Sequence, residues 1–127
     1  MRTEAQEQQA LVQWLRIKKI FHFAPSNENQ GSFLNKKVAM IQERKAQSMG
    51  KMTGIPDIFV FLPDKILAIE LKRARKRLKS GKLSISHVRT SPSQIKCLES
   101  LSAFDYCESR ICYGFIESRD FIIENME

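Results

Sequence analysis

Residues 54–72 read GIPDIFVFLPDKILAIELK and predict two strands joined in an antiparallel hairpin. One apolar run covers 57–62 and a second covers 66–72, with the turn residues Pro63-Asp64-Lys65 between them. Both runs are rich in residues that favour strands. The antiparallel pairing brings the start of the first strand beside the end of the second, so residue 57 is expected close to residues 70–72.

Three charged side chains meet at that end of the hairpin, namely Asp57, Glu70 and Lys72. Strand alternation puts Glu70 and Lys72 on the same face. Two carboxylates can hold Mg²⁺ through hard oxygen ligands, and the metal then activates water and polarises a phosphate. The ammonium can hold the attacking water or offset charge on phosphorus. The alternative is a turn aspartate and a Glu/Lys pair on a solvated strand face, but an unpaired charge beside such apolar strands is costly.

The remaining patterns alternate helices with strands. We expect helices at 4–19 and 32–49, one that opens at Ser91-Pro92, and one at 118–126, with strands at 21–23 and 110–115. The order is α, β, α, β, β, α, β, α. It predicts an α/β fold in which a mixed sheet is flanked by helices, as a single domain over residues 1–127.

The chain is basic, with 21 Lys and Arg against 14 Asp and Glu and a net charge of +7. That charge favours a polyanionic partner, with nucleic acid first and a membrane surface second. Cations crowd residues 73–90, which we interpret as a basic arm that grips phosphates; a solvated loop is the alternative. The predicted nucleic-acid-binding residues are Lys36, Lys37, Arg44, Lys51, Arg73, Arg75, Lys76, Arg77, Lys79, Lys82 and Arg89.

The composition, 43% hydrophobic and 28% charged, is that of a globular domain. The three cysteines show no zinc-ligand spacing, so we expect reduced thiols. No apolar run is long enough to span a membrane, and the first residues lack a signal-peptide core. The expected location is the cytoplasm, with no membrane partner.

Five motifs in order resemble the VRR-NUC family of the PD-(D/E)XK nuclease superfamily, in its small stand-alone, phage-type form. They are an acidic first helix (TEAQEQ, 3–8), an aromatic-Pro-Asn loop (HFAPSN, 22–27), GIPD (54–57), IELKR (69–73) and SPSQ (91–94). The resemblance implies a restriction-endonuclease-like core. The chain departs from the family's pattern at 73–90, where members often have a short Gly-rich turn.

The resemblance also implies a metal shell for Mg²⁺ or Mn²⁺. Asp57 and Glu70 would be ligands, with the Leu71 backbone carbonyl as a third. An acid of the first helix would complete the shell. Helical periodicity cannot choose between Glu4 and Glu7, and spacing to the helix tryptophan, compared with the family, favours Glu4, with Glu7 as second choice.

Lys72 would be the catalytic lysine, and Gln94 would lie at the edge of the site and contact the water or phosphate. The alternative for Gln94 is a solvent-facing residue at a helix start. The implied activity is a DNA endonuclease that reads structure. Small relatives resemble four-way (Holliday) junction resolvases, which act as symmetric dimers, so a homodimer is expected. Alternatives are a flap or nonspecific nuclease, a non-catalytic nucleic-acid-binding module, and an adaptor for an acidic protein.

Overall fold

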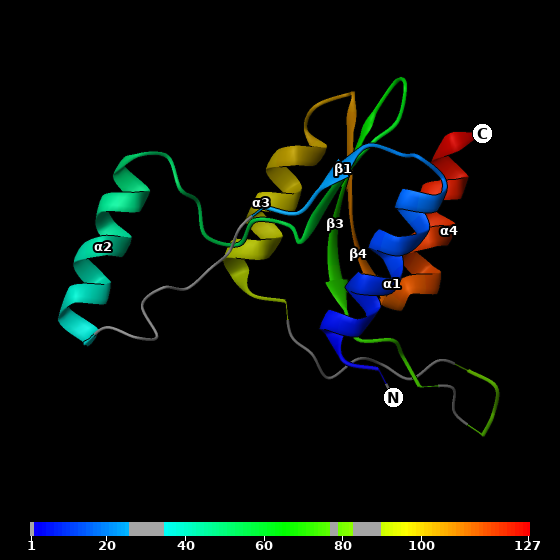
Figure 1. Cartoon of the computed structure of the whole chain (residues 1–127), viewed down its shortest axis with the longest axis horizontal. Coiled ribbons are helices and arrows are strands. Elements are labelled where there is room, and N and C mark those ends of the chain that lie inside the picture. Colours follow the sequence, from blue (N-terminus) through cyan, green and yellow to red (C-terminus); the bar gives the residue numbers. More distant parts are fainter. Residues whose placement is uncertain (1, 26–34, 77–78, 83–89) are drawn as a thin grey trace.

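The computed structural model describes residues 2–25, 35–76, 79–82 and 90–127. Its elements are α1 (Glu4–Ile17), β1 (His22–Phe23), α2 (Lys36–Ser48), β2 (Ile58–Phe61), β3 (Ile66–Lys72), α3 (Pro92–Ser102), β4 (Cys107–Tyr113) and α4 (Gly114–Met126). Their order is the predicted one, and the α/β class with a mixed sheet between helices is confirmed (Figure 1).

The sheet has the strand order β1-β2-β3-β4. β1 pairs antiparallel with β2, β2 pairs antiparallel with β3, and β3 pairs parallel with β4. The predicted hairpin is therefore confirmed, with Ile58 opposite Ile69 and Phe61 opposite Ile66. Since β3 has a partner on each side, it is a central strand, and its residues from Leu67 to Lys72 are all buried.

The main core lies between the sheet and the helices α1 and α4. Leu11 and Leu15 of α1 and Phe121 of α4 join the inward side chains of β2 and β3 there, and all are at most 1% exposed. Figure 1 shows α3 on the other side of the sheet. Alternation along β3 therefore directs Leu67, Ile69 and Leu71 into this core, and Glu70 and Lys72 toward the α3 side.

The predicted last strand and last helix were displaced. β4 begins at Cys107 rather than residue 110, and α4 begins at Gly114 rather than 118. Parallel pairing explains the strand, because β4 matches β3 residue for residue from Ile66–Cys107 to Lys72–Tyr113. Gly114 has φ +91, which lets the chain turn directly from β4 into α4. The first helix also ends earlier than predicted, at Ile17, because Lys19 adopts φ 58.

The second helix forms but does not join the core. Asn35 caps α2 by accepting a hydrogen bond from the Val38 amide at 2.9 Å, and no residue of α2 is buried. Residues 32–34 of the predicted helix lie outside the described residues. Figure 1 shows α2 apart from the sheet. None of the described helices is long and apolar enough to cross a membrane. The three cysteines are free thiols and buried.

Candidate active site

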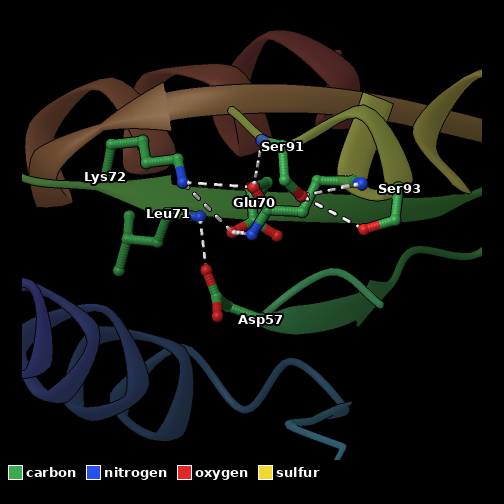
Figure 2. A network of polar contacts seen from close by, with 7 residues as sticks. Asp57, Glu70, Leu71, Lys72, Ser91 and Ser93 are labelled. Atoms are coloured by element: carbon green, nitrogen blue, oxygen red, sulfur yellow. Dashed lines mark hydrogen bonds and ion pairs between the residues drawn. The ribbon is translucent and has the colours of Figure 1, made fainter. Parts of the chain in front are cut away.

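The hairpin brings Asp57 against the end of β3. Continuing the β2–β3 register by one residue puts Asp57 opposite Glu70. The Asp57 carboxylate Oδ2 accepts a hydrogen bond from the Leu71 backbone N–H at 2.7 Å, and Figure 2 shows it pointing at that nitrogen. The Asp57 carboxylate thus accepts the hydrogen bond from Leu71 that a backbone carbonyl of a paired strand would otherwise accept. Because the N–H and C=O of a strand residue point to the same side, the Leu71 carbonyl faces Asp57 as well.

Glu70 is a buried carboxyl group with only one oxygen in hydrogen bonds. Its Oε1 accepts from the Gln94 side-chain amide at 2.9 Å, and the residue is 2% exposed. Its Oε2 is buried and has no hydrogen-bond partner among the described residues. Burial, then the Asp57 carboxylate, raises the pKa of Glu70 to about 8, while the Lys72 ammonium acts in the opposite direction. A buried acid with an unpartnered oxygen is costly to ionise unless a cation joins it.

Lys72 supplies the only ammonium in contact with this carboxyl in the part of the chain that the structure describes. Its Nζ lies 3.7 Å from Glu70 Oε1, as the dashed line in Figure 2 marks. The same Nζ lies 3.5 Å from Gln94 Oε1. The residue is 5% exposed. An ion pair so far from water is poorly screened, so each of these charges strongly affects the others.

Gln94 connects this cluster to the start of α3. The side-chain Oε1 of Gln94 accepts a hydrogen bond from the Ser91 backbone N–H at 3.0 Å. The Gln94 backbone N–H donates to Ser91 Oγ at 3.3 Å, and the two bonds form a capping box. The side-chain Nε2 of Gln94 donates to Glu70 Oε1. Gln94 is therefore half-buried and held on three sides, and the solvent-facing alternative is wrong for it.

Gly54 fixes the distance between the hairpin and α3, a role that the sequence did not reveal. It has φ +77, and a Cβ built on it would lie 2.5 Å from the Ser93 carbonyl carbon and 2.7 Å from the Gln94 nitrogen. No other residue fits between these backbones. The glycine of the GIPD motif could have indicated a close backbone contact, although nothing in the sequence identified α3 as the partner.

The two acids of α1 have different surroundings. Burial and the Asp57 carboxylate raise the pKa of Glu4, and the Lys72 ammonium lowers it, so Glu4 lies within electrostatic reach of the site. Glu7 is buried elsewhere: its Oε2 accepts from the Phe115 amide at the start of α4, and Arg2 lies 4.0 Å away. Glu7 is thus hydrogen-bonded to the start of α4, whereas Glu4 is the acid of α1 that interacts electrostatically with Asp57.

The oxygen donors around Asp57 and Glu70 are of the chemical kind that suits a divalent cation. No group of three or more His, Cys, Asp or Glu side chains that could hold a metal ion occurs among the described residues, so Asp57, Glu70 and Glu4 do not form a complete shell by themselves. However, the unpartnered Glu70 Oε2, the neighbouring Asp57 carboxylate and the Leu71 carbonyl are hard oxygen donors. Such a partial set suits Mg²⁺ or Mn²⁺, which keep several waters.

The predicted nucleic-acid-binding residues are not gathered in one place. Lys36, Lys37 and Arg44 are exposed on α2, and Lys51 follows it with an ion pair to Glu43 at 2.8 Å. In the arm, Arg73, Lys76, Lys79 and Lys82 are exposed. Arg75 is exposed too but engaged, since its guanidinium lies 3.6 Å from Glu117 and 4.1 Å from the Tyr113 ring centroid. Arg77 and Arg89 lie outside the described residues.

Comparison with solved structures finds the same fold in a protein described as a VRR_NUC domain protein. The match covers 98% of this chain and 88% of that chain, with a TM-score of 0.69 and 17% sequence identity. No family model matches the sequence, and no curated protein matches it. The expected resemblance in fold is confirmed, and the identity is low enough that the fold is what the comparison establishes.

Proposed function

We propose that the protein is a metal-dependent endonuclease that hydrolyses DNA phosphodiester bonds. The observation that carries the proposal is the buried Glu70 oxygen without a partner, beside a second carboxylate and an ammonium. Asp57, Glu70 and the Leu71 carbonyl would hold Mg²⁺ or Mn²⁺, with Glu4 as the acid that completes the shell. The fold shared with a VRR_NUC domain protein supports this reading.

The chain's own groups suit phosphoryl chemistry. When bound, the metal would polarise the phosphate and lower the pKa of a coordinated water. Lys72 presents a desolvated ammonium next to Glu70, where it can stabilise negative charge that develops on phosphate oxygens. Gln94 orients the Glu70 carboxylate through its amide, and Asp57 is fixed by the Leu71 amide, so both acids are positioned before substrate arrives.

The finer part of the proposal concerns the substrate and the assembly. We propose a structure-selective enzyme, acting in the cytoplasm, that resolves four-way junctions as a homodimer. The support is the motif resemblance and the net charge of +7. Two copies of the candidate site, one from each protomer, would cut two opposed strands. A nonspecific or flap nuclease has the same site and differs in substrate preference. A non-catalytic DNA-binding module would not need the buried carboxylates.

The test compares wild type with Asp57→Asn on labelled four-way junction, flap and linear duplex, with Mg²⁺, Mn²⁺ or chelator. Asparagine preserves the shape of the side chain and one acceptor oxygen, so folding is expected to survive. We expect cleavage only by wild type with metal, fastest on the junction, and dimers in sedimentation. Equal rates on all substrates would remove the junction claim. Binding without cleavage by both proteins would favour the non-catalytic module.

A further inference from the structure

A groove beside the candidate site is lined by hydrogen-bond donors and cations. It lies between the segment that follows α2 and one side of α3, and its volume is about 350 Å³. Lys51 and Thr53 come from the first wall, and Ser93, Lys96 and Ser100 from α3. Among the described residues, the lining contains two ammonium groups and no carboxylate, so the groove suits an anion with several acceptor oxygens.

The groove is continuous with the site. Ser93 and Gln94 are adjacent on the first turn of α3, and Gly54 abuts both through its backbone. Burial and then the Glu70 carboxylate raise the pKa of Cys97, another groove residue, which puts the groove within electrostatic reach of Glu70. From Ser93 to Ser100 the helix rises about 10 Å, roughly three nucleotide steps along one DNA strand.

The two cations differ in their availability. Lys51 is bound to Glu43 at 2.8 Å, in a pair whose side chains are 38% and 41% exposed. Lys96 is exposed, and no acidic partner is found for it among the described residues. It is also absent from the basic residues that the sequence suggested, because a single lysine in an ordinary amphipathic helix carries no signal.

We propose that this groove binds the sugar–phosphate backbone of the DNA strand being cut, and that Lys96, with Lys51 opposite, holds phosphates next to the scissile one. The inference rests on the proposed nuclease function and adds a substrate-binding surface to it. Phosphates of a DNA strand match the spacing and the donors of the lining, whereas a free anion would need only one of the two ammonium groups.

The test uses Lys96→Ala and a control of equal charge change, Lys18→Ala. Lys18 caps α1 at the end opposite Glu4, about 21 Å along the 14-residue helix. DNA affinity is measured by fluorescence anisotropy in chelator, so that it does not depend on cleavage. We expect Lys96→Ala to raise Kd about fivefold and to reduce the slope of log K against log salt by about 0.9. Lys18→Ala should change Kd less than about twofold.

Two further measurements sharpen the assignment. Glu43→Gln releases Lys51 and should lower Kd, a change opposite in sign to that of Lys96→Ala. Neutral methylphosphonate linkages, placed one at a time beside the cleaved bond, should weaken wild-type binding at one or two positions and have no effect there in Lys96→Ala.

The outcomes separate the two proposals. Equal Kd values for Lys96→Ala and Lys18→Ala, with Asp57-dependent cleavage intact, would overturn the groove and leave the nuclease. A Lys96 effect on binding in a protein that never cuts would overturn the nuclease and leave the groove as a DNA-binding surface.

Discussion

The buried end of the hairpin and the exposed segments α2 and the arm carry charged side chains in opposite environments. Glu70 and Lys72 are 2% and 5% exposed and share hydrogen bonds with Gln94. The cations of α2 and of the described arm are exposed. Inside, little water screens the charges, so each group depends on its neighbours. Outside, solvent and salt screen each cation, and the effects are small and additive.

Lys72→Met tests the buried end of this comparison most strongly. Methionine keeps the apolar stem and removes the ammonium, so charge on the phosphate would lose its desolvated partner. We expect the single-turnover cleavage rate to fall about 10²–10³-fold while DNA affinity in chelator stays nearly constant. If rate and affinity fell together, Lys72 would belong with the binding residues of the surface.

Gly54→Ala tests whether the site depends on close backbone contact. The new Cβ would clash with Ser93 and would also strain the positive φ, and we expect a loss of about 3 kcal/mol in unfolding free energy. Gly50→Ala is the control, because its φ is +103 with nothing within 4 Å, and it should lose about 1 kcal/mol. Urea unfolding measures both, and equal losses would leave only the φ strain.

Glu4→Gln and Glu7→Gln separate a functional acid from a structural one on the same helix. Glu7→Gln should lose about 1 kcal/mol of stability, since the α4 N-terminus loses its negative partner. Its cleavage rate should be unchanged below the unfolding temperature. Glu4→Gln should slow cleavage about tenfold or more at similar stability, by analogy with the loss of a single electrostatic group. Stability curves and rates that showed the reverse would make Glu7 the metal-shell acid.

Glu70→Gln should stabilise the metal-free protein. The pKa of Glu70 is raised from 4.5 to about 8, so the folded state binds more protons than the unfolded state across this range. Stability from this group is present below about pH 4.5 and is lost as pH rises through 8. We expect the variant to melt about 3–6 °C above wild type at pH 8, equivalent to about 1 kcal/mol, with little difference at pH 4. A gap independent of pH would assign the effect to packing.

Lys79→Ala and Lys82→Ala test the exposed end and should have the smallest effects. Each is expected to raise the Kd for DNA about two- to threefold near 0.15 M salt, and the double variant should show the product of the two. Thermal unfolding should not change. Loss of cleavage in either single variant would mean that the arm reaches the reacting phosphate.

The sequence predicted most of the hairpin because its signals are local. Apolar runs, a turn and a carboxylate at each end identify residues 57–72 without knowledge of the rest. It did not predict that Glu70 Oε2 is buried without a hydrogen-bond partner among the described residues. Nor did it predict that Gly54 contacts α3 or that α2 is exposed. These depend on how elements meet in space. α1 and α2 both carry apolar residues at helical spacing, yet of the two only α1 buries them, because α1 lies over the sheet and α2 does not.

The hydrogen bonds that Gln94 makes to Lys72 and Ser91 have a consequence for the arm. Gln94 contacts Lys72, the last residue of β3, and Ser91, just before α3, so the two ends of the arm are fastened to the same amide group. The entropy of closing a loop grows slowly with its length, by about 0.6 kcal/mol for each doubling. An insertion or deletion between 73 and 90 is therefore expected to alter the length and charge of the arm without moving the carboxylates. Under the proposed nuclease function, changes in the arm would alter the preferred substrate while the groups that carry the chemistry stay the same.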